Sequence, residues 1–425
     1  MILLTHPTGN TFSRALLRGL EERGLLGFFA TTFAARSDSF WLKALPGKLR
    51  RELLRREYAL PDSKLITRPA RELVRLAAER FKIGALTKHE HGFASFDAIY
   101  HDLDSYLARA LPDLARRGAL RAVYAYEMGA IEVFEAAREL GLRRFYELPI
   151  AYWETSQRLL AEEAQRWPQW KPTLLAVDDS PEKCARKKRE LELAELVVCP
   201  SQFVRDSIPE SLQRGRQCVV AEFGTPPQPE PERAAIRADG RLRVLFAGSM
   251  TQRKGLADVF AAMKALNRDD VELVVVGSPL APMEFYRGEY SGFRYEPTRP
   301  HAEMLELMRS CDVLTLPSIV EGRALVQQEA MAQGLPLIAT ANAGAQDLID
   351  EGATGFLVPI RSPAAIAERI AWFADNRKQL PTMRHAAWQK ATALTWERYA
   401  NRIITSIESC FAESNSSAAP LPARV

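Results

Sequence analysis

The chain has 425 residues, a formal net charge of +4 and an apolar share of 47%. This length predicts two domains of about 200 residues each, and so small a net charge does not indicate a nucleic-acid-binding protein. The five cysteines are scattered and include no Cys-x-x-Cys pair. That distribution argues against a disulfide framework or a zinc site and favours a reducing compartment.

The beginning of the sequence, MILLTHPTGN, has only four leading apolar residues before His6 and Pro7. This run is too short for a signal peptide. The sequence also has no run of 18 or more apolar residues, so we expect no membrane-spanning helix. A cytoplasmic protein is therefore the expectation.

The first half of the chain alternates short apolar runs with helical patterns. Residues 1–5 predict a strand, and Gly9 and Asn10 lie in the turn between it and a helix that starts near Ser13. Gly9 would let a ligand approach the backbone closely, although a plain turn explains it equally well. Further strands are predicted at 27–34, 122–127, 143–153, 196–201 and 218–224. This alternation is typical of an α/β fold with a parallel, doubly wound sheet.

A basic insertion interrupts this pattern near residues 40–95. The stretches 41–58 and 69–86 are amphipathic and rich in Lys and Arg, with a break at Pro61. The favoured interpretation is a pair of helices whose apolar face packs on the domain's own sheet. The alternative is a peripheral membrane contact through these basic helices, at the inner face of the membrane.

The motif His89-Glu90-His91 offers two imidazoles and a carboxylate. The sequence supplies no third well-spaced ligand, so a surface loop is expected here and no metal site.

The clearest linker is TPPQPEPER at residues 225–233, with four prolines in nine residues. We place the domain boundary there, with a first domain over 1–230 and a second over 231–395. A helix over 396–412 is expected to cross back onto the first domain, and the Ser-, Ala- and Pro-rich tail 413–425 to be disordered. In the second domain we predict strands at 241–248, 271–277, 293–297, 313–318, 336–341 and 354–359, and a short helix at 345–352.

The most informative stretch runs from residue 311 to residue 344. A buried strand, VLTLPS, leads into a loop with Glu321 and Gly322; a helix then begins near Arg323 and is stopped by Gly334-Leu-Pro. Parallel strands in this order place ligands at strand carboxyl ends and at the helix N-terminus. Glu329 lies about two turns inside the helix and can lean back toward the same mouth.

The pattern PS-x2-EG-x6-E-A-M-A-x-G-x-P-x-I-A-T-x-x-x-G, which ends at Gly344, resembles the core signature of the retaining glycosyltransferases of family 4 type (glycosyl transferases group 1). The resemblance is close over residues 240–375 and holds only in outline in the first domain, where PSQFVRDS (200–207) is the best local match. It implies the GT-B fold, two Rossmann-like domains with a cleft between them. It also implies a nucleotide diphosphate sugar as donor substrate, no cofactor, and an unidentified sugar, lipid or small-molecule acceptor.

The resemblance assigns roles to individual residues. Glu321 would contact the transferred sugar, and Glu329 would accept hydrogen bonds from the ribose hydroxyls. Lys254 matches the family's phosphate-binding lysine, whereas Ser249 occupies the family's arginine position, for which Arg253 is a candidate replacement. Lys254, Arg253 and Glu321 are thus the candidate catalytic residues. The other donor-binding candidates are Gly248, Ser249, Gly277, Ser278, Gly322, Arg323, Ala324 and Leu325.

The acceptor side is less well defined. Many family members carry a histidine after the strand equivalent to 143–147, where this sequence has Glu147. The acceptor-side candidates are Gly9, Asn10, His101 and Glu147; His6 and His101, the alternatives to the missing histidine, are better explained as structural. Without a protein base, the departing phosphate would itself take the acceptor proton, as is usually proposed for the retaining enzymes of this family.

A further expectation concerns the mechanism of transfer. No Asp-x-Asp stands near a strand end, so transfer is expected to be metal-independent.

Two alternatives to an active glycosyltransferase stay open. One is a nucleotide-sugar-binding subunit without activity, which Ser249 motivates; the other is another GT-B enzyme such as a nucleotide-sugar epimerase or a phosphorylase.

Overall fold

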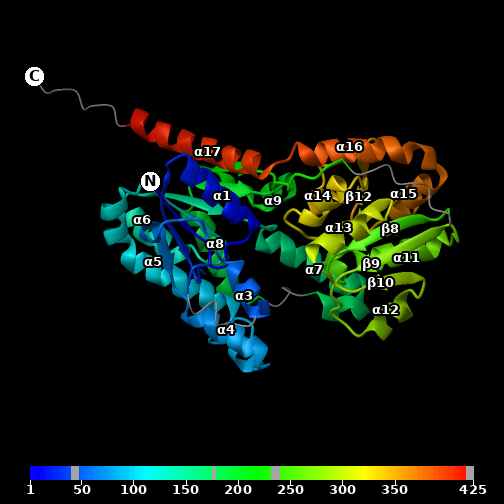
Figure 1. Ribbon diagram of the computed structural model, residues 1–425, viewed down its shortest axis with the longest axis horizontal. Coiled ribbons are helices and arrows are strands. Elements are labelled where there is room, and N and C mark those ends of the chain that lie inside the picture. Colours follow the sequence, from blue (N-terminus) through cyan, green and yellow to red (C-terminus); the bar gives the residue numbers. More distant parts are fainter. Residues whose placement is uncertain (40–46, 175–178, 231–239, 418–425) are drawn as a thin grey trace, which may run out of the picture.

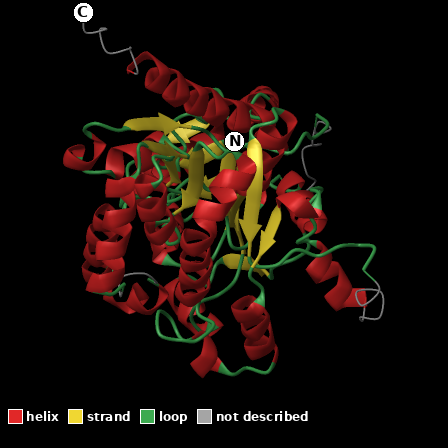
Figure 2. Cartoon of the chain, turned by 90° about the vertical axis from the view of Figure 1, so that its left-hand side faces the viewer, coloured by secondary structure: helices red, strands yellow, loops and turns green. Residues whose placement is uncertain are grey.

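The computed structural model describes residues 1–39, 47–174, 179–230 and 240–417. Two parallel sheets, one in each half of the chain, are surrounded by helices (Figures 1 and 2). This confirms the expected α/β class with two Rossmann-like units. Among the described residues, no helix combines the length and apolar character that a membrane crossing requires.

The first sheet has seven strands in the order β3-β2-β1-β4-β5-β6-β7. Its strands are β1 (Ile2–Thr5), β2 (Leu26–Thr31), β3 (Leu65–Thr67), β4 (Ala122–Tyr126), β5 (Arg143–Glu147), β6 (Leu196–Cys199) and β7 (Gln217–Val220). Alternate residues of β1 point to opposite faces, so Leu3 joins one apolar cluster while Ile2 and Leu4 join another. The sheet is therefore buried on both faces, as a continuous apolar run predicts.

Helices cover both faces of this sheet. The helices that connect its strands are α1 (Thr11–Glu22), α5 (Phe96–Gly118), α6 (Ile131–Glu139), α7 (Trp153–Arg166), α8 (Pro181–Leu193), α9 (Gln202–Ser207) and α10 (Glu210–Gln213). The insertion between β2 and α5 contains α3 (Gly47–Leu54), η1 (Asp62–Lys64), β3, α4 (Ala70–Arg80) and η2 (Gly84–Thr87).

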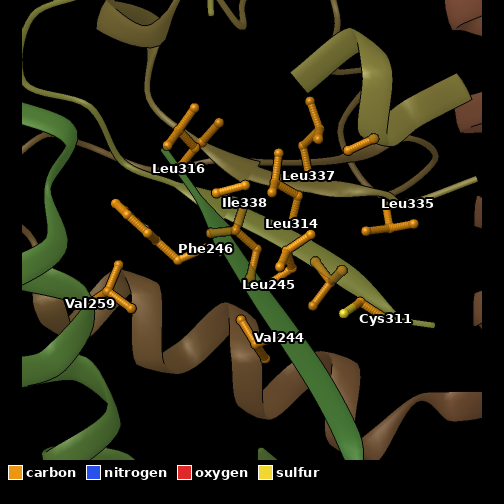
Figure 3. Packing of buried hydrophobic residues seen from close by; sticks show 14 of the residues in the cluster. Val244, Leu245, Phe246, Val259, Cys311, Leu314, Leu316, Leu335, Leu337 and Ile338 are labelled. Atoms are coloured by element: carbon orange, nitrogen blue, oxygen red, sulfur yellow. The ribbon is translucent and has the colours of Figure 1, made fainter. Parts of the chain in front are cut away.

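The second sheet has six strands in the order β10-β9-β8-β11-β12-β13. They are β8 (Leu242–Ala247), β9 (Val271–Val276), β10 (Phe293–Glu296), β11 (Val313–Leu316), β12 (Leu337–Ala339) and β13 (Gly355–Leu357). The core around the central strands is apolar, and Leu245, Leu314 and Ile338 illustrate its aliphatic part (Figure 3). The helices are α11 (Leu256–Leu266), α12 (Met283–Glu289), α13 (His301–Arg309), α14 (Leu325–Ala332), α15 (Pro363–Asp375) and α16 (Leu380–Thr392).

Three local predictions were wrong. Residues 345–352 form turns and no helix, because Thr354 bonds back to the backbone of Leu348 and Asp350 and closes the chain after one turn. Strand β3 was missed, since three residues at a sheet edge are too short to show a period. Helix α17 (Trp396–Ser417) runs into the tail expected to be disordered from 413 onward; residues 418–425 of that tail lie outside the described residues.

The basic insertion is only partly as predicted. Residues 40–46, the start of its first predicted helix, lie outside the described residues, and α3 begins at Gly47. Leu53 of α3 packs with Ala35 and Leu76 in a small cluster of its own. Leu53 and Leu54, the described leucines of α3, therefore belong to this small cluster and not to the clusters on the main sheet.

An arm of the first half of the chain reaches into the second domain. It consists of α7 and the 3-10 turn η3 (Pro168–Thr173). Trp170 is fully buried there, with its ring 5.0 Å from that of Phe285, 5.6 Å from Tyr286 and 5.9 Å from Phe260. Burial of a tryptophan of this size makes the arm part of the second domain's core. A single domain boundary at residue 230 assigns this arm to the first domain, although it packs in the second.

The last helix connects the domains a second time. Helix α16 packs on α14 of the second domain, whereas α17 lies beside α1 of the first (Figure 1). Ile403, Ile404 and Ile407 of α17 are fully buried in the first domain's core. The crossing expected from the sequence is thus present.

Glu147 holds this crossing in place. Its carboxyl group is fully buried and accepts hydrogen bonds from Tyr124 at 2.6 Å and from Tyr399 of α17 at 2.8 Å. Burial raises the pKa of Glu147 to about 7, although both tyrosine bonds oppose the rise. Its placement on the acceptor side was wrong, because the side chain points into the interior between sheet and helix.

Replacement of Glu147 by glutamine should weaken the pH dependence of stability. The folded protein favours the protonated carboxyl of Glu147. Its contribution to the free energy of unfolding is therefore complete below pH 4.5, the ordinary pKa of a glutamate, and is lost as the pH rises through about 7. The loss amounts to on the order of 3 kcal/mol. Between about pH 5 and about pH 8, melting curves of Glu147→Gln should therefore shift less than those of the parent and of Glu139→Gln, which changes an exposed carboxylate. Equal shifts in all three proteins would contradict this.

Candidate functional site

A cavity of about 620 Å³ lies between the domains. The first domain contributes three apolar residues, Phe12, Pro149 and Phe223. The second domain contributes Ala247, Gly248, Ser249, Arg253, Lys254, Val276, Gly277, Ser278, Thr298, Arg299, Met304, Glu321, Arg323, Ala324, Leu325 and Val326. Most of the donor-side residues predicted from the sequence thus come together.

Two glycines shape the floor of this cavity. Gly248 follows β8 with a φ of 148°, and Gly277 follows the neighbouring β9 with a φ of 152°. A Cβ atom on Gly277 would lie 1.8 Å from the carbonyl oxygen of Gly248. Both the backbone angle and the close approach require glycine. The strand ends therefore leave the floor open to a ligand.

Three charged groups meet at the mouth of the cavity. Arg253 and Lys254 lie in the turn η4 (Gln252–Lys254), and both donate to the same oxygen of Glu321, Arg253 at 3.0 Å and Lys254 over a very short contact. Burial alone would raise the pKa of Glu321, but the charges of Lys254 and Arg253 outweigh it and hold that pKa low. Burial, together with Arg253, lowers the pKa of Lys254. The arrangement is a buried carboxylate clamped by two cations.

The N-terminus of α14 points at the same place. Its first residues, Leu325 and Val326, line the cavity, and the cap residue Ala324 makes no side-chain hydrogen bond to the helix. The first N–H groups of a helix have no partner within the helix. They offer positive potential for an anion beside Lys254.

Two donor-side candidates are engaged elsewhere. The carbonyl oxygen of Gly322 accepts a hydrogen bond from Ser201 of the first domain at 2.7 Å, and Gly322 does not line the cavity. The guanidinium of Arg323 pairs with Asp347 at 2.9 Å and donates to Gln328 at 3.1 Å. Gly322 therefore links the two domains, and the side chain of Arg323 holds its own loop. The Nη2 atom of Arg323 is buried and has no hydrogen-bond partner among the described residues.

Glu329 lies beside this lining and is not part of it. Its carboxylate is 4.0 Å from the imidazole of His301, one helical turn before Met304, which does line the cavity. Burial raises its pKa. Its contact with a ribose stays a prediction, because only a ligand that extends along α13 would reach it.

The residues predicted for the acceptor side lie away from the cavity between the domains. Gly9 and Asn10 organise the turn around His6: the buried His6 accepts hydrogen bonds from the N–H groups of Thr8 and Gly9, and Asn10 caps α1. Burial lowers the pKa of His6 to about 3, so the ring is neutral. His101 lines a separate cavity beside α8 and not the one between the domains. These residues are not brought to the donor site.

Sequence reasoning missed an aromatic pair on the first-domain side. Phe12 stacks on Phe223 with ring centres 4.9 Å apart and planes 8° from parallel. Phe12 follows the Gly9-Asn10 turn, and Phe223 comes shortly after β7. Neither position carries a motif, but both follow strand carboxyl ends, which is the signal that was available.

Arg299 was also missed. It follows β10, lines the cavity and pairs with Glu296. One of its buried nitrogens, Nε, has no hydrogen-bond partner among the described residues.

A buried polar network fixes the turn that carries the two cations. Gln252, fully buried, donates to Glu163 of the arm at 2.7 Å and to Asp258 at 2.8 Å. Glu163 also pairs with Arg361, and Asp258 pairs with Arg166 at 2.7 Å. Because buried charges are costly unless paired, this network holds Gln252, and with it Arg253 and Lys254, in one position.

The structure supplies the third group that the His89-Glu90-His91 motif lacked. His89, Glu90 and Asp179 come together within the described residues at metal-ligand spacing. The ammonium of Lys183 lies among them, 2.9 Å from Asp179 and 3.2 Å from His89. The cluster is therefore an ion-paired network around Lys183 in this arrangement.

Comparison with known proteins places this geometry in a class. The chain superposes on sucrose-phosphate synthase from Thermosynechococcus elongatus with a TM-score of 0.65 and 17% identity, over 97% of this chain and 99% of that one. It superposes on HepE from Anabaena, solved in complex with UDP, with a TM-score of 0.58 and 15% identity, over 96% and 99%. The fold is that of the two-domain GT-B glycosyltransferases.

The sequence narrows the class to a family. Residues 229–391 match the family model of the glycosyl transferases group 1. A relative, D-inositol 3-phosphate glycosyltransferase from Corynebacterium glutamicum, is 29% identical over 185 residues, which span 40% of this chain and 44% of that protein. The chain thus spans less than half the length of the first curated relatives it matches.

Removal of a single buried charge from the network around Gln252 should lower the stability of the folded protein. In Glu163→Gln the fully buried partner of Arg361 is lost, and we expect stability to fall by about 3 kcal/mol. Glu162→Gln, its neighbour on α7, removes a half-exposed partner of the same arginine and should lower the free energy of unfolding much less. Chemical denaturation of both variants measures the difference. Equal losses would show that burial of the network is not what fixes the turn.

Proposed function

We propose that this protein is a retaining glycosyltransferase that moves a sugar from a nucleotide diphosphate sugar to an acceptor held by the first domain. The observation that carries the proposal is the meeting of Lys254, Arg253 and Glu321 with the N-terminus of α14 at one mouth of the cavity. The resemblance of the second domain to the glycosyl transferases group 1 supports it.

The chemistry follows from where negative charge develops. As the bond between the sugar and the diphosphate stretches, charge grows on the leaving diphosphate, and fixed cations and N–H groups stabilise it there. Lys254, Arg253 and the first N–H groups of α14 are in position. Without donor, Glu321 pairs with both cations and offsets one of their two charges. With donor, the phosphate oxygens would share the cations and leave Glu321 beside the sugar.

The lining also bears on the stereochemical course. Among the described residues that line the cavity, Glu321 carries the only carboxylate, and none is a histidine. A hydrolase of the inverting or retaining kind needs a pair of carboxylates across the sugar. We therefore infer that the departing phosphate accepts the acceptor proton and that the configuration of the sugar is retained.

The alternative of a subunit that binds nucleotide sugar without transfer rests on Ser249. Its side chain lines the cavity at the position where the resembled family has arginine. Arg253 approaches from the other side of the same loop and is already paired with Glu321. We favour the transferase, because one of the two expected cationic groups, Lys254, is in place and Arg253 supplies a second.

The direct test is turnover. A panel of nucleotide sugars incubated with the protein should yield one nucleoside diphosphate in preference to the others, with retention at the anomeric carbon when an acceptor is supplied. We expect activity to survive EDTA, because Glu321 is already paired with Lys254 and Arg253, and cationic side chains with a helix N-terminus can stabilise the diphosphate without a metal. Tight nucleotide binding without release from any donor would favour the inactive subunit. Loss of activity in EDTA with rescue by Mn²⁺ would contradict metal independence.

Removal of the Lys254 charge should affect turnover more than binding. We expect Lys254→Ala to lower turnover roughly 10²–10³-fold, because the charge acts most strongly on the leaving diphosphate. Lys264→Ala is the matched control, since Lys264 is exposed on α11, the helix that follows the same turn. Steady-state rates at saturating donor measure the effect, and two variants with equal rates would remove Lys254 from the site.

A further inference from the structure

We propose that the stretch 73–96, on the first domain, is a docking surface for an anionic lipid bilayer. The proposal stands on an unusual concentration of exposed apolar side chains together with cations. It is independent of the transfer chemistry, because none of these residues lines the donor cavity.

The apolar part of this docking surface is large. Of the eight large hydrophobic residues that are exposed in the described part of the chain, five fall within these 24 positions. They are Phe81, 73% exposed, Phe96 at 59%, Phe93 at 54%, and Leu73 and Ile83 at 46% each. Apolar side chains exposed in such density mark an interaction site more often than scattered single residues do.

The helical period explains how α4 presents these groups. Leu73, Ala77 and Phe81 follow one another at four-residue spacing and are all exposed, whereas Glu72, Arg75 and Ala78 are buried. Residues four apart share one helix face. The inner face of α4 is thus buried through the ion pair of Arg75 with Glu72 and through Ala78. The outer apolar face has no partner among the described residues.

The turn after α4 extends the docking surface. Lys82 has a φ of 57°, in the left-handed region, and stands between the exposed Phe81 and Ile83. Such a conformation is uncommon for a residue with a side chain. Phe93 and Phe96 are held beside α4 by the guanidinium groups of Arg71 and Arg75, which lie 4.3 Å and 5.1 Å from the respective ring centres.

Cations surround these apolar groups. Arg80, Lys82 and Lys88 are exposed within the stretch, and the exposed acid, Glu79, is already paired with Arg75. Aromatic side chains at the level of the headgroups and cations beside them are the two features that interfacial binding requires.

Charge complementarity favours an anionic bilayer over a second copy of this chain as the partner of the docking surface. In a symmetric contact with a second copy, these cations would face their own copies and repel. An anionic bilayer offers both apolar depth for Phe81, Phe93 and Phe96 and negative headgroups for the lysines. Helix α4 lies at the end of the first domain opposite α17, so a flat surface can approach it without meeting that helix (Figure 1).

Sedimentation with vesicles tests the proposal on the full chain. The protein should pellet with vesicles of phosphatidylcholine and phosphatidylglycerol, should stay in solution with phosphatidylcholine alone, and should be released as the salt concentration rises. The variant Lys82→Glu/Lys88→Glu should bind at least about tenfold more weakly. Its matched control is Arg116→Glu/Arg214→Glu, which makes the same change of charge at two highly exposed positions outside the stretch.

A second pair of variants tests the apolar part. Phe81→Ser/Phe93→Ser should abolish pelleting, whereas Leu140→Ser, at an exposed leucine elsewhere, should not. Unchanged melting temperatures and nucleotide binding would show that the variants are folded. Binding to neutral vesicles, equal losses in the control variants, or a dimer in solution that dissociates in Phe81→Ser/Phe93→Ser would each overturn the proposal.

Discussion

The insertion of Trp170 and the helix before it into the second domain is the constraint on which the site depends. Once this arm is buried, Glu163 lies inside the second domain and meets Gln252, Arg361 and the pair of Asp258 with Arg166. A buried carboxylate that loses its partners is costly. The position of the turn with Arg253 and Lys254 is therefore tied to a segment that belongs to the first half of the chain.

This arrangement limits how the domains can move. The arm must travel with the second domain, because its tryptophan is enclosed by Phe260, Phe285 and Tyr286. Near the cavity, individual hydrogen bonds connect the two domains. Ser201 donates to the carbonyl oxygen of Gly322, and Gln328 donates to Thr225 and to the carbonyl oxygen of Phe223. Any opening would break these contacts first, at the edge of the cavity.

The fold was predictable from the sequence because its signals are local. Apolar runs such as VLTLPS and LRVLFA give buried strands, and glycines at strand ends give the turns. The cluster of Lys254 and Glu321 was predictable because a motif carries it. Glu147 was misplaced because nothing local shows that Tyr399, far along the chain, donates to it. Phe12, Phe223 and Trp170 share that difficulty, since their roles arise from contacts between distant segments.

The replacement of an expected arginine by Ser249 is consistent with the charge balance of the site. Lys254 and Arg253 already place two cations on one carboxylate oxygen of Glu321. A third cation at the partly exposed position of Ser249 would line the same cavity without a carboxylate of its own, since Glu296 is taken by Arg299. Like charges close together repel each other. With serine there, Lys254, Arg253 and Glu321 together carry one net positive charge and not two. The diphosphate then brings the negative charge that the two cations and the α14 N-terminus are arranged to receive.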